Sequence, residues 1–210
     1  MIGNPYFLPN ANCMIMQLFT YNKHDVLSFA KTTGKFGGLS NMAADYVLFV
    51  NETVIPNTEA LYQACKFSLY PNIQRLIIEE SNPIISKRIS RHYQSLVRSD
   101  WEEIKFTVME WCIRLKLLQN WDRFGGLLKE SGTSVIVEYS TKDGIWGAKP
   151  NGNNILEGYN ILGRILMKMR AEYVIPNKKP YKILPPNVVG FLLYGQPIKE
   201  VFAPEYYLDD

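Results

Sequence analysis

Length, composition and charge limit the classes of protein to which this chain can belong. The sequence has 210 residues, of which 47% are hydrophobic and 20% are charged, so the chain can bury a core and is not disordered. The formal net charge of +3 at pH 7 permits an anionic partner without requiring one. The start lacks the regions of a signal peptide, and no apolar run reaches membrane-spanning length. We therefore expect a cytoplasmic protein of one globular domain with extensions.

The cysteine and histidine counts argue against a disulfide framework and a His-rich metal site. Cys13, Cys65 and Cys112 are odd in number and show no C-x-x-C spacing, so we interpret them as reduced thiols of an intracellular protein. His24 and His92 are too few for a His-rich metal centre or for a mechanism that uses several imidazoles. We expect neither a metal ion nor a cofactor.

In chain order, the predicted elements are those of a mixed α+β protein. The first two dozen residues look irregular. Alternation of apolar and polar residues predicts a strand at 25–30, a hairpin at 46–55 and a strand at 134–140. Helical spacing and caps predict helices at 59–69, 71–80, 83–91, 101–120, 121–130 and 161–173. Prolines begin the helices at 71 and 83, Asp100 is the expected cap of the helix at 101, and Asn160 stands at the expected N-cap of the helix at 161.

We predict a compact, mostly helical single domain with a small sheet. Its boundaries are a 1–24 N-terminal extension, a 25–174 catalytic domain and a 175–210 C-terminal arm that is Pro-rich and holds one short strand. In the long helix, Trp101 is expected to face the core while bordering a cleft, and Lys105, Arg114 and Lys116 are expected to be solvated.

The segment "PNTEALYQACKF" (56–67) predicts a helix with a chemically varied face. Thr58 is the expected N-cap, and Glu59, Tyr62, Gln63 and Lys66 follow at helical spacing. A glutamate in the first turn is stabilised by the positive end of the helix dipole. On helix pattern alone a solvated face is the commoner arrangement, so a functional site requires other segments that close over it.

Three loops are candidates for closing over that face. "GKFGGLSN" (34–41) combines glycines with Ser40 and Asn41, which suits phosphate but matches neither the Walker pattern nor G-x-G-x-x-G. "KDGIWGAKP" (142–150) carries Trp146, a ring that can stack on a base or sugar or can pin its own loop. "GYNILGR" (158–164) begins a helix whose N-terminus and arginine can hold phosphate, although an arginine on a solvated face is commoner.

Together these segments resemble the NADAR family, also called YbiA-like. "FGGLSN", "PNTEALYQACKF", "RSDWEEIK", "IVEYSTKDGIWGAKP" and "GYNILGRILMKMR" occur in the order and spacing of that family between about Asp25 and Glu172. The resemblance implies a small mixed α/β fold and N-glycosidase chemistry on ribose-linked substrates, with no metal or redox cofactor required.

Two branches of this family differ in substrate. One looks like a glycosidase for phosphoribosylated intermediates of the riboflavin pathway and tends to carry E-H-x-Y/F-Q and W-G-x-G. The other looks like the antitoxin partner of DarT-type DNA ADP-ribosyltransferases and removes ADP-ribose from guanine. Here Ala60 stands at the His position and Trp146 begins W-G-A-K-P, so the chain resembles the second branch better.

The favoured branch implies ADP-ribosylated guanine in DNA as substrate, ADP-ribose as product, a toxin as partner and no membrane. The riboflavin-type glycosidase and a non-catalytic module that binds ADP-ribose or NAD remain alternatives. By position in the motifs, Glu59 matches the catalytic carboxylate and Lys66 the basic residue two turns later. The expected substrate-binding residues are Gly37, Gly38, Ser40, Asn41, Tyr62, Gln63, Trp101, Asp143, Trp146, Gly147, Asn160 and Arg164.

Overall fold

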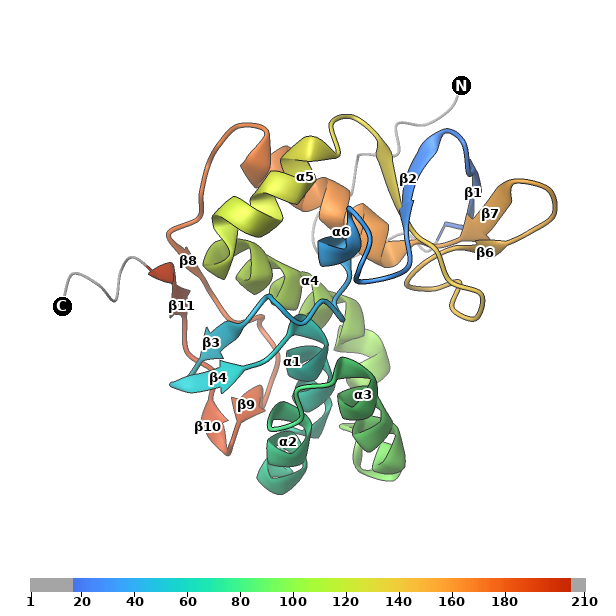
Figure 1. Cartoon of the computed structure of the whole chain (residues 1–210). Helices are drawn as coiled ribbons and strands as arrows, with labels where there is room; N and C mark the ends of the chain where they lie inside the picture. Colours follow the sequence, from blue (N-terminus) through green and yellow to red (C-terminus); the bar gives the residue numbers. More distant parts are fainter. Residues whose placement is uncertain (1–16, 205–210) are drawn as a thin grey trace. The chain divides into compact units, whose positions relative to one another are not determined.

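The computed structural model describes residues 17–204 and confirms the predicted α+β class (Figure 1). The chain divides into two compact units, each built from two separate stretches of sequence. Unit 1 combines the chain up to Ser40 with residues 125–178, and unit 2 combines residues 41–124 with the chain from Lys179 onward. Among the described residues, no helix is long and apolar enough to cross a membrane.

Unit 1 contains two small sheets. β1 pairs antiparallel with β7, β7 pairs antiparallel with β6, and β2 pairs parallel with β5. Their bounds are β1 (Phe19–Asn22), β2 (Val26–Phe29), β5 (Val135–Glu138), β6 (Lys149–Pro150) and β7 (Ile155–Gly158). The expectation that the first two dozen residues are irregular is wrong for the residues of β1. The strand forms by pairing with β7, which lies far along the chain and gives no local signal. The remainder of that expectation, for residues 1–16, falls outside the described residues.

Helix α6 (Ile161–Met169) of unit 1 packs on the parallel strand pair, and the other helices of the unit contact α6 or one another. These other helices are η1 (Gly37–Leu39), α5 (Gly126–Glu130) and the π-helical turn η5 (Arg170–Val174). α6 lies against β5 so closely that a Cβ added at Gly163 would stand 2.2 Å from the carbonyl oxygen of Ile136. Glycine is therefore needed where this helix crosses the strand.

Unit 2 is dominated by helices. They are α1 (Thr58–Ala64), η2 (Cys65–Phe67), α2 (Pro71–Ile78), α3 (Pro83–His92), η3 (Gln94–Leu96), α4 (Trp101–Gln119) and the π-helical turn η4 (Trp121–Gly125), which crosses the boundary between the units. α1 packs against α2, α3 and α4, and every one of its residues is buried (Figure 1). α1 therefore has no solvated face, although a solvated face is the commoner arrangement for a helix with this sequence pattern.

Two predicted caps differ from the structure. α1 is capped by Asn57, whose Oδ1 accepts a hydrogen bond of 2.9 Å from the amide of Ala60, and Thr58 is the first residue inside the helix. Asp100 precedes α4 as predicted, but its carboxylate makes no capping bond. Arg98 draws it away with hydrogen bonds of 2.6 and 3.0 Å. The guanidinium bears a full charge and binds both carboxylate oxygens, which a single backbone amide at the cap cannot do.

Lys116 is wrongly predicted to be solvated. Its side chain is completely buried in α4, and its Nζ lies 4.2 Å from the ring centroid of Tyr46 and 4.5 Å from that of Phe124. Burial lowers the pKa of Lys116 well below its ordinary value, and the charge of Arg123 lowers it further. The periodicity of α4 could not predict this, because both rings come from outside the helix.

The predicted hairpin is confirmed and holds part of the C-terminal arm. β3 (Leu48–Val50) pairs with β4 (Thr53–Ile55) through a turn in which Asn51 and Glu52 both have positive φ. Asn51 then donates to the carbonyl of Pro197 at 2.9 Å and accepts from the amide of Lys199 at 3.0 Å. The arm contains β8 (Lys182–Ile183), β9 (Leu192–Leu193), β10 (Gln196–Pro197) and β11 (Val201–Phe202), so it is structured beyond the single strand expected.

Candidate active site

The predicted catalytic carboxylate is buried at the start of α1. Glu59 is only 4% exposed, and its Oε1 accepts a hydrogen bond of 2.8 Å from Nε2 of Gln63. Nζ of Lys87, from α3, lies 3.5 Å from the same oxygen. The Glu59 amide also donates to the carbonyl of Asn41 at 3.1 Å. Because a buried carboxylate loses its hydration, these partners are what makes its burial tolerable.

The predicted amine lies about two turns after the carboxylate. Burial lowers the pKa of Lys66 from 10.5 to about 8; Glu59 and Glu102 act to raise it, and Lys87 and Arg91 to lower it. At pH 7 about a tenth of such a lysine is a neutral amine. The side chain can therefore supply a proton as the ammonium or attack a carbonyl carbon as the amine.

Two aromatic rings flank the lysine. Nζ of Lys66 lies 5.8 Å from the ring centroid of Tyr62 and 5.4 Å from that of Trp101, distances at which cation–π attraction acts. The rings themselves are 5.0 Å apart and tilted by 56°. Burial raises the pKa of the Tyr62 phenol, and the charge of Glu59 raises it further. Tyr62 therefore stays neutral near pH 7 and cannot act as a phenolate base.

Two buried acceptor atoms near this group have no hydrogen-bond partner within residues 17–204. They are Oδ1 of Asn41 and Oε1 of Gln63. The Gln63 amide is oriented, because its Nε2 must face the Glu59 carboxylate, which leaves Oε1 as an acceptor. Nδ2 of Asn41 contacts the sulfur of Met109 at 2.8 Å. Buried acceptors in proteins normally have a donor, so each of these atoms can accept a hydrogen bond from a water molecule or from a ligand hydroxyl group.

The structure thus groups six predicted residues within unit 2. These are Asn41, Glu59, Tyr62, Gln63, Lys66 and Trp101. It also adds two that the sequence did not single out, namely Lys87 and Arg91 of α3. A signal was present, because these cations are four residues apart and therefore share a helix face. Nothing in the sequence, however, pairs that face with α1.

The other predicted residues belong to unit 1. They are Gly37, Gly38, Ser40, Asp143, Trp146, Gly147, Asn160 and Arg164. Oδ1 of Asp143 accepts from the amides of Ile145 and Trp146, both at 2.9 Å, and so fixes its own loop. A Cβ added at Gly147 would stand 2.3 Å from the carbonyl oxygen of Glu138. Both positions therefore have a structural role within the unit, and their substrate contacts stay predictions.

The start of α6 is also held by side-chain bonds inside unit 1. Asn160 precedes the helix with a φ of 49° and makes no cap with its side chain. Its Nδ2 instead donates to the carbonyl of Ile136 at 2.8 Å, and its Oδ1 accepts from the amide of Glu138 at 3.1 Å. Arg164 lies with its guanidinium 5.5 Å from the ring centroid of Phe19, and burial lowers its pKa. Asn160 therefore stands at the expected N-cap position of α6, but its side chain anchors the helix to β5 and does not cap it.

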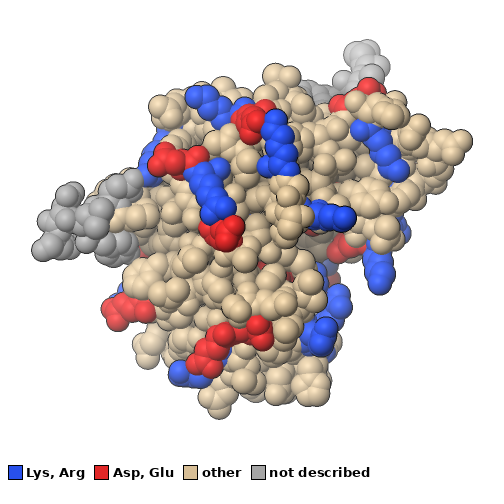
Figure 2. Space-filling view, in the orientation of Figure 1, with Lys and Arg blue, Asp and Glu red and all other residues tan. Residues whose placement is uncertain are grey.

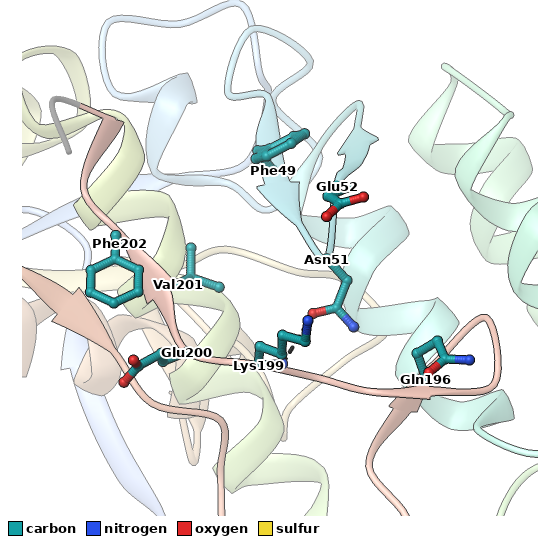
Figure 3. Close-up of a pocket in the computed structure, with 8 residues that line it drawn as sticks. All are labelled: Phe49, Asn51, Glu52, Gln196, Lys199, Glu200, Val201 and Phe202. Atoms are coloured by element: carbon teal, nitrogen blue, oxygen red, sulfur yellow. Dashed lines mark hydrogen bonds between the residues drawn. The ribbon is translucent and has the colours of Figure 1, made fainter. Parts of the chain in front are cut away.

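A separate pocket in unit 2 lies beside the β3–β4 hairpin. It has a volume of about 450 Å³, and its walls come from the hairpin and from the arm (Figure 3). Phe49 and Asn51 line one side, and Lys199 and Glu200 line the other. None of the predicted site residues lines it. No group of three or more His, Cys, Asp or Glu residues in the described part of the chain could hold a metal ion.

Fold and site together define an α+β protein with a buried carboxylate beside a desolvated lysine. The NADAR domain family matches residues 28–173, and the chain belongs to this family. The "N-glycosidase YbiA" of Escherichia coli strain K12 is 30% identical over 71% of this chain and 89% of that protein. The NMR structure of E. coli YbiA superposes with a TM-score of 0.62 at 29% identity, covering 74% of this chain and 89% of that one.

Other relatives are larger proteins. The "Riboflavin biosynthesis protein PYRR, chloroplastic" of Zea mays is 35% identical over 70% of this chain. A riboflavin biosynthesis protein of Vibrio vulnificus strain YJ016 is 34% identical over the same share. The chain spans only 25% of the maize protein and 40% of the Vibrio protein.

Proposed function

We propose that this chain is an N-glycosidase that hydrolyses the bond between a ribose and a nitrogenous base. The observation that carries the proposal is the pairing of a buried carboxylate, Glu59, with a desolvated amine, Lys66, on one buried helical segment. The names of the YbiA relatives support the reaction class. Glycosidic cleavage needs a carboxylate at the sugar and an acid at the leaving group, and this pair offers both.

The proposed reaction passes through an oxocarbenium-like state. The C1′–N bond breaks, its electron pair goes to the base, and positive charge grows on the ribose. The Glu59 carboxylate stabilises that charge and takes a proton from the water that attacks C1′. The Lys66 ammonium gives a proton to the leaving nitrogen. The acceptors of Asn41 and Gln63 suit hydroxyl groups of the ribose.

Lys66 also permits a covalent route. The neutral amine attacks C1′, the C1′–N bond breaks and its electron pair leaves with the base; the ribose ring then opens to give an imine between Lys66 and C1′, which water later hydrolyses to free the sugar and the lysine. The low pKa of Lys66, about 8, supports this route because it supplies the neutral amine near pH 7. The two routes differ in whether the protein is transiently bonded to the sugar.

For the substrate, we propose ADP-ribosylated guanine in DNA, with an antitoxin role. The support is Ala60 at the position where the riboflavin-type branch tends to carry histidine. Ala60 is completely buried in α1, so this chain presents no imidazole there. The names of the maize and Vibrio relatives favour a second candidate, a phosphoribosylated intermediate of riboflavin biosynthesis.

One experiment separates these functions. The full-length protein is incubated in parallel with an oligonucleotide carrying ADP-ribosyl guanine and with a phosphoribosylated pyrimidine, and the products are identified by mass spectrometry. Release of free ADP-ribose with unmodified guanine supports the first function, and release of the pyrimidine base supports the second. If calorimetry detects ADP-ribose binding but neither substrate is cleaved, the chain is a binding module and the enzymatic proposal fails.

A further inference from the structure

Helix α3 places two cations beside the proposed site. Lys87 and Arg91 are four residues apart and therefore lie on one face of the helix, which packs against α1. Nζ of Lys87 lies 3.5 Å from Oε1 of Glu59, Arg91 follows one turn later on the same face, and the charges of both act to lower the pKa of Lys66. Figure 2 shows Lys and Arg side chains over α3 on the face that is drawn. None of the predicted site residues comes from this helix.

The carboxylates near Lys66 are already engaged by other lysines. Glu59 pairs with Lys87, and Glu102 pairs with Lys105 one turn further along α4. The nearby positive charge is therefore not balanced by the nearby negative charge.

Arg91 differs from those lysines. Its side chain is exposed, and it has no ion-pair partner in the part of the chain that the structure describes. Together with Lys66, it leaves about two positive charges near the site without a carboxylate of their own. An arrangement of this kind attracts an anion.

We propose that Arg91, assisted by Lys87, forms an anion subsite that binds the 5′-phosphate of the ribose whose glycosidic bond is cleaved. The inference rests on the proposed function and names the group that positions its substrate. In a phosphoribosyl compound this group is a monoester with nearly two negative charges at neutral pH, and in ADP-ribose it is half of a pyrophosphate that carries about two in all, so both match the surplus. The planar guanidinium of Arg91 can bind two phosphate oxygens at once, which a lysine cannot do.

The subsite also links substrate binding to the protonation of Lys66. The charges of Lys87 and Arg91 lower the pKa of Lys66, whereas Glu59 and Glu102 raise it. A phosphate bound to the two cations offsets their repulsion, so the pKa of Lys66 rises when the anion binds. The protein should therefore take up a fraction of a proton on binding. That proton sits on the group proposed to protonate the leaving base.

The test measures binding rather than turnover. Ribose 5-phosphate and ribose are titrated by calorimetry into the full-length protein and into Arg91→Ala, Arg91→Lys and Arg88→Ala. Arg88 is the matched control, because it is an exposed arginine on the same helix, three residues before Arg91, and lies off the face that Lys87 and Arg91 share. We expect Arg91→Ala to weaken ribose 5-phosphate binding about tenfold, the scale of a charge-assisted bond. Arg91→Lys should recover part of that loss, and Arg88→Ala should bind like the wild type.

Four results would overturn the subsite. They are equal affinity of wild type and Arg91→Ala for ribose 5-phosphate, an equal loss in Arg88→Ala, equal binding of ribose and its phosphate, and no binding of the phosphate by the wild type. An unmodified oligodeoxynucleotide serves as a further arm. If only its binding depends on Arg91, the arginine contacts a DNA backbone phosphate and the proposal fails.

Two readouts keep this test separate from the proposed function. Proton uptake is obtained by repeating the titration in buffers of different ionisation enthalpy, and it should be smaller in Arg91→Ala. The hydrolysis assay is run independently on the same proteins. A protein that cleaves substrate but binds ribose 5-phosphate equally well with and without Arg91 retains the function and loses the subsite. A protein that binds ribose 5-phosphate through Arg91 but cleaves neither substrate retains the subsite and loses the proposed function.

Discussion

Glu59 is almost fully buried and is held by polar partners on two sides. We expect Glu59→Gln to abolish the release of ADP-ribose, with turnover reduced by about 10²-fold or more, because the amide can neither balance an oxocarbenium charge nor accept a proton. Release is followed by mass spectrometry. The amide oxygen can still accept from Gln63, so the thermal unfolding curve should remain cooperative. Turnover at the wild-type rate would remove Glu59 from the mechanism.

Lys66 offers two chemical roles that predict opposite pH profiles. As a proton donor it must be an ammonium, so the rate should fall as the pH rises through about 8, the pKa that burial gives it. As an imine-forming amine it must be neutral, so the rate should instead rise through the same range. We expect the falling profile for the direct route, measured as kcat/KM between pH 6 and about pH 9.5.

Chemical trapping tests, independently of the pH profile, whether Lys66 forms an imine with the sugar. Borohydride added during turnover reduces an imine to a stable amine, so the covalent route predicts a protein whose mass has increased by a reduced ADP-ribosyl group. Lys66→Arg serves as the control, because arginine keeps the charge and cannot form this adduct. A rising pH profile together with trapping would replace the direct route by the covalent one. Activity that survives in Lys66→Arg would leave the lysine a purely electrostatic role.

At the scale of elements, the site depends on how firmly α1 is held. We expect Asn57→Ala to lower the free energy of unfolding by about 1–2 kcal/mol, because the cap is lost and Nδ2 also donates to the carbonyl of Ser81. Asn82→Ala, at the exposed N-cap of α3, should lower it less. Urea unfolding of both variants measures the difference. An equal effect at the two caps would show that the burial of the α1 start adds nothing.

Elements with a strong local signal were predicted well from the sequence. The hairpin at Asn51, the prolines that begin α2 and α3, and the long periodic pattern of α4 each lie within a few residues of the expected position. The cap of α1 was placed one residue late, because Asn57 and Thr58 are both good capping residues and only the backbone geometry distinguishes them.

Features that depend on distant parts of the chain could not be predicted. β1 forms a strand because it pairs with β7, whose residues lie more than a hundred positions later. α1 and Lys116 are buried by packing against other parts of the chain, and the periodicity of their own segments cannot reveal those contacts. The same holds for the site. Glu59 and Lys66 follow from one motif, whereas the cations of α3 are recognised only when the helices are packed.

At the scale of the whole molecule, each compact unit is assembled from two separate stretches of sequence, so each depends on contacts made late in the chain. In unit 2 the late stretch is the arm. Gln74 of α2 donates to the carbonyl of Leu192 at 2.9 Å and accepts from the amide of Tyr194 at 2.7 Å. The ring of Phe191 lies 5.1 Å from that of Trp111 in α4, edge to face. These contacts indicate that the arm is an integral part of the unit.

Replacing Phe191 tests that conclusion. We expect Phe191→Ala to lower the free energy of unfolding by about 3–4 kcal/mol, because a nearly buried ring and its contact with Trp111 are both lost. Val189 lies two residues earlier and is 90% exposed, so Val189→Ala should change the stability by less than about 0.5 kcal/mol. Urea unfolding followed by Trp fluorescence measures both. If the two variants unfold alike, the arm can detach without loss of the fold. A large loss in Phe191→Ala alone means that the packing of the arm onto α2 and α4 contributes to the stability of unit 2, which holds Glu59 and Lys66.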